Sequence, residues 1–457
     1  HFRYKSSLLH VGKTFVSLKR AEMAATIKDP DEDSSRPKGK HIKAVLVNKL
    51  EGCSGVVNMA VTIPHEDAVI SVSDDKSIRL WIKRESGQYW PSVCHVMESE
   101  CSALDYHGTS RRLFVGLDDG AISEFEVSED FNRLHASRKY LAHMNRLTGI
   151  VFSLENEWLL SVGRDKYLQW HDCTTGKRLG GFQTEAWCTS LQFDAESKHV
   201  FVGDYGGHIS VIKLESSSLS LVTTLNGHSG KLRPWHSWFG TGSVRSLAWD
   251  AESKLLFSGS FDESIIVWDI GGQKGTALEL HGHITKVQSL CYAPHAKKLI
   301  SCSEDGIVRI WDMNVKRKET PEWSQSDVCE RCGGPFFWNF KGMWSQKAVG
   351  VRQHHCRKCG RAVCNECSNN ESSYPIMGFE NSVRFCTECY ADITDEDREP
   401  LADFHDAKHT TRSLHLDLSK GRLLTCGGDR IIKVSLASPF ECLYLGHKSN
   451  SPVMSID

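Results

Sequence analysis

The sequence predicts an all-β protein in which seven copies of one repeat close as a seven-bladed β-propeller that carries a small cysteine-rich insertion. Two observations support this prediction: a unit of alternating strand residues and turns that recurs along the chain, and eight cysteines in four C-x-x-C pairs within one short segment. The composition of the 457 residues, 40% hydrophobic and 25% charged, is that of a folded globular chain. A formal net charge of -2 excludes a globally basic binder, and we expect no nucleic-acid partner.

The beginning of the chain, residues 1–40, is expected to be a disordered segment. Its second part, from Lys28 to Lys40, is charged and rich in residues that interrupt helices and strands. The first 22 residues precede Met23 and are basic, and the sequence leaves their role open. No apolar run approaches the ~18 residues that a membrane-spanning helix needs, so we expect a soluble or peripherally bound protein.

Residues 41–315 are expected to form the first six blades of the propeller. The clearest repeats run from Ser243 to Ile270 and from Gly282 to Met313, and both end in a strand that contains a tryptophan. Weaker copies end at Trp81, Phe125, Trp170, Ile212 and Ser435. The pattern of a Gly-His turn, a strand serine, a turn aspartate and a terminal tryptophan resembles the WD-repeat family, in which these residues form a buried hydrogen-bonded tetrad.

Two repeats carry a complete candidate tetrad. The candidates are His228, Ser258, Asp262 and Trp268 in one blade and His283, Ser301, Asp305 and Trp311 in another. A buried aspartate must be paired, and a neutral imidazole can link it to a hydroxyl. These residue types could also form a hydrolase triad, but the set recurs with a tryptophan, so we favour the structural role. Cys53, Gly206 and Ser435 replace tetrad residues in other repeats, which we expect to be held less firmly.

The last repeat is expected to span residues 400–440 and to close the ring, with residues 441–457 as a tail of uncertain structure. A strand from one terminus usually completes such a ring, and Lys43 to Leu50 has the pattern to do so. The tail looks instead like the start of another repeat, so the closing segment stays open. The loop from Lys231 to Gly242 holds two tryptophans and is either a partner-binding loop or a lid on the propeller, and we favour the lid.

The inserted module, residues 320–392, lies between the predicted sixth and seventh blades and carries the four C-x-x-C pairs. Eight thiolates supply two tetrahedral zinc sites, and a segment too small for its own core gains folding free energy from the metal. In a cross-braced module the first and third pairs share one ion, and the second and fourth share the other. The predicted ligands are Cys329, Cys332, Cys364 and Cys367 for the first zinc ion and Cys356, Cys359, Cys386 and Cys389 for the second.

The residues around the second cysteine pair point to one kind of zinc module. The run RQHHCRKCGR, from Arg352 to Arg361, closely resembles the FYVE signature R-R/K-H-H-C-R-x-C-G. FYVE domains bind phosphatidylinositol 3-phosphate, whose phosphate suits guanidinium forks, and the resemblance implies membranes with this lipid as a partner. By resemblance, the phosphate contacts are Arg352, His354, Arg357 and Arg384, the ring-hydroxyl contacts are Asp327 and His355, and the residues inserted into the bilayer are Val349 and Val351.

The order of the parts resembles the small WD-repeat and FYVE domain-containing proteins. This resemblance implies a non-enzymatic adaptor or scaffold, cytosolic and peripheral on early endosomes, whose zinc finger binds phosphatidylinositol 3-phosphate and whose propeller binds protein partners of unknown identity. The sequence contains no recognisable catalytic constellation. The alternative is a RING-like ubiquitin ligase with a substrate-binding propeller, which eight cysteine ligands beside a basic motif disfavour.

Some residues depart from the FYVE pattern. Gln353 stands at a usually basic position, Trp323 and Asp327 are one residue further apart than in W-x-x-D, and Phe385 replaces a valine. We therefore expect a head-group affinity below the family average. The segment between the first and second cysteine pairs is rich in aromatic residues, and we favour their packing against the propeller over contact with lipid. These residues are Phe336, Phe337, Trp338, Phe340 and Trp344.

Overall fold

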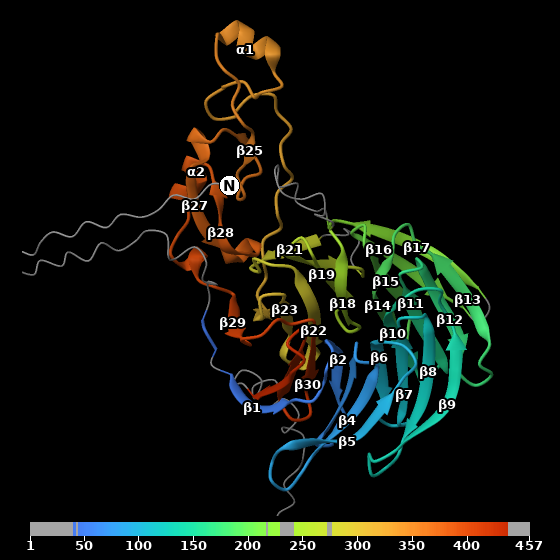
Figure 1. The fold of residues 1–457 in the computed structure, drawn as a ribbon. Helices are drawn as coiled ribbons and strands as arrows, with labels where there is room; N and C mark the ends of the chain where they lie inside the picture. Colours follow the sequence, from blue (N-terminus) through green and yellow to red (C-terminus); the bar gives the residue numbers. More distant parts are fainter. Residues whose placement is uncertain (1–39, 43, 216–217, 229–241, 272–276, 437–457) are drawn as a thin grey trace, which may run out of the picture. The chain divides into compact units, whose positions relative to one another are not determined.

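The computed structural model describes residues 40–42, 44–215, 218–228, 242–271 and 277–436 (Figure 1). The N-terminal residues 1–39, the loop predicted as a lid with Trp235 and Trp238, and the tail after residue 436 lie outside the described residues. The described strands form seven sheets of propeller type, six with four strands and one extended to six strands, and a small hairpin. The predicted fold class, a seven-bladed WD-repeat β-propeller with an inserted cysteine-rich module, is confirmed.

The first four blades are consecutive antiparallel meanders, in which each strand pairs with the next. Inside each blade a tight turn joins the second and third strands, and its last residue has a positive φ that glycine adopts without strain, as at Gly120 (φ 90°) and Gly207 (φ 93°). The sixteen strands are β2 (Val57–Thr62), β3 (Ala68–Ser73), β4 (Ser77–Lys83), β5 (Tyr89–Val96), β6 (Cys101–His107), β7 (Arg112–Leu117), β8 (Ala121–Val127), β9 (Leu134–Leu141), β10 (Leu147–Ser153), β11 (Trp158–Gly163), β12 (Tyr167–Asp172), β13 (Arg178–Gln183), β14 (Cys188–Asp194), β15 (His199–Asp204), β16 (His208–Leu214) and β17 (Leu219–Asn226).

The sixth blade shows where the module is inserted. Its outer strand, β29, pairs with β24 although the whole module separates the two strands in the sequence. The insertion therefore falls within the sixth blade, and its predicted place between the sixth and seventh blades is wrong. The reason is that a repeat such as Gly282–Met313 ends after the third strand of its blade, so the outer strand of the sixth blade follows only after the module. The fifth and sixth blades contain β18 (Val244–Asp250), β19 (Leu255–Ser260), β20 (Ser264–Asp269), β21 (Ala277–His281), β22 (Val287–Ala293), the 3-10 helix Pro294–Ala296, β23 (Lys298–Ser303), β24 (Ile307–Asp312) and β29 (Ala402–Asp406).

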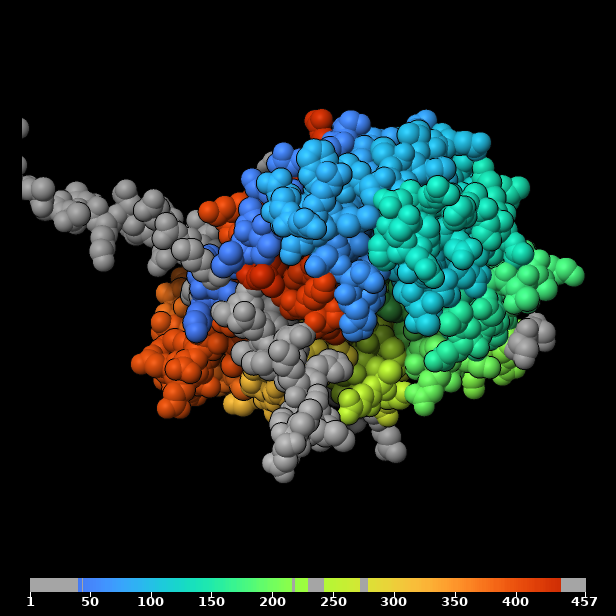
Figure 2. All heavy atoms as spheres, turned by 90° about the horizontal axis from the view of Figure 1, so that it is seen from below, coloured from blue at the N-terminus to red at the C-terminus, as the bar shows by residue number. Residues whose placement is uncertain are grey.

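The seventh blade is closed by the N-terminal strand. It contains β30 (Ser413–Asp417), β31 (Arg422–Cys426), β32 (Ile432–Leu436) and β1 (Val45–Leu50). Strand β1 runs antiparallel to β32, from Val45 opposite Leu436 to Leu50 opposite Ile432. In Figure 2 the red residues of the last blade lie directly beside the blue residues of the first strands. Of the two closing segments that the sequence allows, the structure uses the N-terminal one.

An arginine network ties the last blade to the first. Arg422 Nη2 donates to Asp417 Oδ2 at 2.7 Å, and its Nη1 donates to Asp67 Oδ1 and to Tyr89 Oη of the first blade, each at 2.8 Å. The side chains of Arg422 and Asp417 are buried, so the bond between them is shielded from water, whereas Asp67 is partly exposed. The closing blade is thus joined to its neighbour by polar contacts as well as by the apolar core.

The tetrad of the fifth blade is complete. His228 Nε2 lies 2.7 Å from Ser258 Oγ, and its Nδ1 lies 3.1 Å from Asp262 Oδ2. Trp268 Nε1 donates to the same Ser258 oxygen at 2.8 Å. Because Ser258 is fully buried and already accepts the indole N–H, this set stabilises the blade and is not placed to attack a substrate.

The tetrad of the sixth blade is interrupted. His283 Nε2 lies 2.7 Å from Ser301 Oγ, and Trp311 Nε1 donates to that oxygen at 2.9 Å. Asp305 instead accepts from Ser303 Oγ at 2.6 Å, and His283 Nδ1 has no hydrogen-bond partner among the described residues. The predicted link between His283 and Asp305 is therefore wrong. Burial lowers the pKa of His283 far below its usual range, so its imidazole is neutral.

Asp262→Asn is expected to lower the free energy of unfolding by about 1–3 kcal/mol at neutral pH, because it replaces the charged carboxylate that pairs with the buried His228 by a neutral amide. Burial raises the pKa of Asp262, but hydrogen bonds from His228 and Ser264 outweigh it and hold this pKa below its usual 3.8. A depressed carboxyl pKa stabilises the fold above the unfolded-state value and loses this effect as the pH falls. Urea unfolding should show a difference between wild type and variant that shrinks as the pH falls below the unfolded-state pKa, and a pH-independent difference would contradict this assignment.

The inserted module contains short hairpins and helices around a small core. Its elements are α1 (Phe340–Gln346), β25 (His354–His355), β26 (Ala362–Val363), β27 (Asn370–Tyr374), β28 (Phe379–Phe385), α2 (Thr387–Ala391) and the 3-10 helices Glu366–Ser368, Pro375–Met377 and Glu396–Arg398. Buried aromatic side chains, including Phe336, Tyr374 and Phe385, pack with the cysteines. Strands β28 and β27 extend the sheet of the fifth blade beyond β21 (Figure 1).

The contact between β28 and the fifth blade uses backbone atoms. The N–H of His281 donates to Gly378 O at 2.7 Å, and the His281 ring stacks on Phe379 with centroids 5.1 Å apart. Gly378 has a φ of 86°, and a Cβ built there would lie 2.0 Å from Glu279 O. Only glycine fits this close approach. The module is thus joined to the propeller by more than its two connecting chains.

Candidate functional site

The eight cysteines of the module form two clusters of four. One contains Cys329, Cys332, Cys364 and Cys367, and the other contains Cys356, Cys359, Cys386 and Cys389. Within each cluster the sulfur atoms lie within 4.8 Å of one another, and the sulfurs of Cys332 and Cys364 are 3.7 Å apart. Four thiolates around zinc at ~2.3 Å lie about 3.8 Å from one another. The donor set therefore fits two zinc ions, and the structure brings together the cysteine pairs that the sequence predicts.

Hydrogen bonds to the sulfurs favour the thiolate form that zinc requires. The N–H of Cys364 donates to Cys329 Sγ at 3.3 Å, and Arg331 Nη2 donates to Cys386 Sγ at 3.5 Å. Burial raises the pKa of Cys386, but hydrogen bonds from the Cys389 N–H and from Arg331 outweigh it and lower this pKa to about 7. Sequence reasoning missed Arg331, because it lies inside the first cysteine pair and yet serves the second cluster.

Three arginines gather around His354 on strand β25. Burial lowers the pKa of the half-buried His354, and the nearby positive charges of Arg384, Arg352 and Arg357 lower it further. Arg352 and Arg357 flank β25 and Arg384 comes from β28, so these two segments bring three positive charges near one imidazole. The predicted phosphate contacts are therefore neighbours in the structure.

The three arginines differ in how they are held. Arg384 Nη1 donates to Asn365 Oδ1 at 2.9 Å and to Ser368 O at 2.7 Å. Arg357 lies over the ring of Trp323, 4.6 Å from its centroid. Arg352 is exposed and makes no hydrogen bond or ion pair with any other described residue. Its guanidinium group is therefore the one of the three that is wholly available to a ligand.

The segment that begins at Trp323 lies along strand β25. The ring of His355 stacks on Trp323 with centroids 4.7 Å apart, and His355 Nε2 lies 3.0 Å from Ser324 O. Gln353 Nε2 donates to Ser326 O at 3.4 Å. His355 and Gln353 thus position this segment, which explains why a glutamine can replace the usual basic residue at this place.

Asp327 follows the same segment and is exposed. Its Oδ1 accepts a hydrogen bond from the indole N–H of Trp338 at 2.8 Å. Its other carboxylate oxygen has no hydrogen-bond partner among the described residues and faces solvent. Sequence reasoning missed Trp338 as a partner of Asp327, because nothing in their spacing indicates the contact.

The tip of the module exposes apolar side chains. Val349 is 85% exposed, and Trp344 and Phe340 of α1 are 89% and 73% exposed. The predicted packing of the aromatic residues on the propeller is therefore wrong: Phe336 lies in the core of the module itself, and the others are exposed. No helix within the described ranges is long and apolar enough to cross a membrane.

Val351 does not belong to this exposed tip. Its N–H donates to Pro335 O at 2.9 Å, it forms a bridge with Phe336, and its side chain packs against the core of the module. Of the two valines predicted to insert into a bilayer, Val349 is exposed and Val351 packs inside the module, because the chain turns inward at Gly350, which is buried.

Comparisons with known families agree with this geometry. The model of the FYVE zinc finger matches residues 320–395. The model of the WD domain, G-beta repeat, matches residues 219–269 and 275–312. The first match identifies the two-zinc module as a FYVE finger, in place of the RING-like alternative.

Similar proteins cover most of the chain. WD repeat and FYVE domain-containing protein 1 of Mus musculus is 49% identical over 403 residues, which are 88% of this chain and 95% of that protein. WD repeat and FYVE domain-containing protein 2 of Homo sapiens is 52% identical over 399 residues, 87% of this chain and 97% of that protein. The crystal structure of the WD40 β-propeller domain of Doa1 matches with a TM-score of 0.54 and 16% identity, covering 86% of this chain and 97% of that one, and shows the fold alone. The chain therefore belongs to the WD repeat and FYVE domain-containing proteins, whose two domain types are those of a non-catalytic adaptor.

Proposed function

We propose that the protein is a non-enzymatic adaptor that binds phosphatidylinositol 3-phosphate through its FYVE finger and protein partners through its propeller. It acts in the cytosol as a peripheral protein of early endosomes. The observation that carries this proposal is the gathering of three arginines around His354, close in sequence to the exposed Val349. Two zinc ions, held by the eight cysteines, supply the fold of the finger and take no part in chemistry.

The proposed head-group site uses the free atoms of these side chains. Arg352 offers a whole guanidinium fork, while Arg384 offers the nitrogens that its contacts with Asn365 and Ser368 leave free. His354 donates to the phosphate from between them. Asp327 accepts from a ring hydroxyl through the carboxylate oxygen that Trp338 does not use, and His355 offers its Nδ1 because its Nε2 already faces Ser324 O.

Liposome flotation tests this proposal. The intact chain should float with liposomes that contain phosphatidylinositol 3-phosphate and not with those that contain the 4- or 5-phosphate. Arg352→Ala should weaken this binding at least about tenfold, since it removes a charge-assisted hydrogen-bonding group and leaves the fold intact. The matched control is Arg361→Ala, which removes an equally exposed arginine of the same finger. Flotation without preference among the three lipids, or equal losses in the two variants, would overturn the proposal.

Val349→Asp is expected to weaken flotation without weakening binding of a soluble head group. Burying one valine contributes roughly 1.5–3 kcal/mol, which corresponds to about a 10- to 100-fold change in partitioning. The matched control is Val96→Asp, because Val96 lies on the propeller strand β5 and is 69% exposed. If both variants float like the wild type, the tip does not enter the bilayer.

A further inference from the structure

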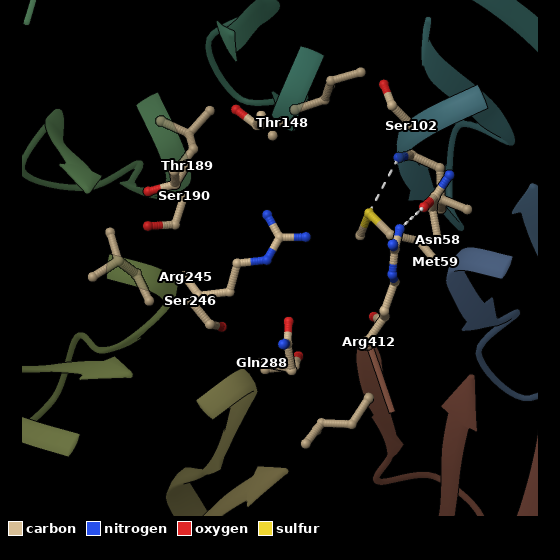
Figure 3. Close-up of a pocket in the computed structure, with 18 of the residues that line it drawn as sticks. Asn58, Met59, Ser102, Thr148, Thr189, Ser190, Arg245, Ser246, Gln288 and Arg412 are labelled. Atoms are coloured by element: carbon tan, nitrogen blue, oxygen red, sulfur yellow. Dashed lines mark hydrogen bonds between the residues drawn. The ribbon is translucent and has the colours of Figure 1, made fainter. Parts of the chain in front are cut away.

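The inner strands of the seven blades surround a central channel with a cavity of about 1150 Å³. In six blades the inner strand begins with a β-bulge, and the extra residue of each bulge lines the channel. In the seventh blade Arg412, which directly precedes β30, takes the same place, since Arg-Ser-Leu occurs both there and at the bulge of β18. The seven equivalent residues, which we term the channel ring, are Asn58, Ser102, Thr148, Thr189, Arg245, Gln288 and Arg412 (Figure 3).

Most members of the channel ring hold neighbouring strands together. Thr148 Oγ1 donates to Cys188 O of the next blade at 2.9 Å, and Ser102 Oγ donates to Gly116 O at 3.1 Å. Arg412 Nη1 donates to Asn58 Oδ1 at 3.0 Å, which links the last blade to the first. These side chains have structural partners, although Arg412 uses only its Nη1 in this contact.

Arg245 and Gln288 have no such partners. Neither side chain makes a hydrogen bond or an ion pair with any other described residue. Figure 3 shows the Arg245 guanidinium group pointing from β18 into the middle of the channel. Burial lowers the pKa of Arg245 to about 10, and the positive charges of Arg412, Arg164 and Arg146 contribute. An arginine placed among like charges, without a carboxylate, costs free energy unless an anion accompanies it.

The lining of the channel carries more cations than acids, and Arg146 also pairs with Asp118 at 2.8 Å and with Glu100 at 3.3 Å, outside this lining. The lining contains five cations, Arg146, Arg164, Arg245, Lys286 and Arg412, and three acids, Asp74, Asp105 and Glu304. Two of the acids are already paired, Asp74 with Arg146 at 3.0 Å and Glu304 with Lys286 at 3.7 Å. The third, Asp105, accepts the N–H of Phe152 at 2.7 Å. None of these three carboxylates forms an ion pair with Arg245 in the described part of the structure.

We propose that the channel binds a small phosphorylated anion, held by Arg245 with Gln288 and Arg412. Guanidinium groups from the fifth and seventh blades flank the amide of the sixth, so a phosphate group between them receives donors from three blades. The cavity is large enough for a small organic phosphate, since ligand pockets typically measure about 300–1,000 Å³. This site lies in the propeller and is independent of the head-group site in the finger.

Isothermal titration of the full-length, zinc-loaded chain with inorganic pyrophosphate tests this proposal. Because the finger also carries arginines, each channel variant is made in the Arg352→Ala background. This background should still bind one pyrophosphate per chain, and adding Arg245→Gln should weaken that binding at least about tenfold. The matched control, Arg133→Gln, removes an exposed arginine from the turn between β8 and β9 and should leave the affinity unchanged.

Three results would overturn the proposal: loss of all pyrophosphate binding with Arg352→Ala alone, unchanged affinity with Arg245→Gln, or equal losses with Arg245→Gln and Arg133→Gln. Melting temperature and zinc content show whether each variant is folded. Should Arg245→Gln fail to fold, Gln288→Glu provides a second test, because a carboxylate at this place would pair with Arg245 and exclude the anion. Unchanged affinity in that variant would equally overturn the proposal.

Discussion

Cys364→Ser is expected to release the zinc ion of the first cluster and to unfold the finger while the propeller stays folded. Structural zinc contributes roughly 10–16 kcal/mol of binding free energy in isolated fingers, and the core of this module is too small to replace it. Cys364 is buried, and serine at this position removes one of the four sulfur ligands of the first zinc ion. Zinc measured per folded chain should fall from two to one or none, with new tryptic cleavage between residues 320 and 395.

Cys94→Ser is the matched control, because Cys94 is an exposed cysteine of the propeller strand β5 and belongs to neither cluster. It should keep two zinc ions and the wild-type cleavage pattern. Cys386→Ser should also disturb the contact between the finger and the propeller, which Cys364→Ser should not. Cys386 directly follows β28, and the first residue of β28 pairs with the propeller. Two zinc ions and an intact finger in Cys364→Ser would show that the clusters are not the metal sites.

The zinc clusters and the blades could be predicted from the sequence because both depend on residues with fixed spacing. A C-x-x-C turn offers two sulfurs to one metal wherever it occurs, and a His, Ser and Trp at repeat spacing mark one blade. Asp305 shows the limit of such spacing. It stands at the tetrad position, yet it accepts a hydrogen bond from the hydroxyl of Ser303 and none from His283. The choice between two nearby donors depends on local geometry that the sequence does not reveal.

Features that depend on contacts between distant segments could not be predicted. Val349 and Val351 are the same residue type two positions apart, but only the structure shows that the backbone of Val351 pairs with Pro335. The channel ring carries five different residue types at its seven equivalent places, so it leaves no repeat signal in the sequence. Only the alignment of the bulges in space places Arg245, which has no hydrogen-bond or ion-pair partner among the described residues, in this ring.

Removing strand β1 is the second change with a large expected effect. Strand β1 covers β32 along the last blade, and Leu50 is buried in the core shared by Trp81 and Val434. A chain that begins at residue 51 loses this strand, so β32, which is otherwise paired on both sides, becomes the edge of the sheet and can pair with another chain. Loss of the Leu50 side chain alone costs about 1.5–3 kcal/mol, and the lost strand pairing adds to it. We expect a free energy of unfolding lower by at least about 3 kcal/mol, together with aggregation.

The matched control is a chain that begins at residue 40, which keeps β1 and lacks only residues outside the described part of the structure. Urea unfolding and size-exclusion chromatography should show this chain to be as stable and monodisperse as the full one. Equal urea midpoints for the chains that begin at residues 40 and 51 would mean that another segment can supply the closing strand, which is the role that the sequence also allows for the tail. Because Arg422 still links the last blade to Asp67 and Tyr89, the shortened chain should keep its seven blades together. It should lose mainly the outer strand of the last blade. A lower midpoint with an unchanged zinc content would therefore separate the closure of the propeller from the folding of the finger.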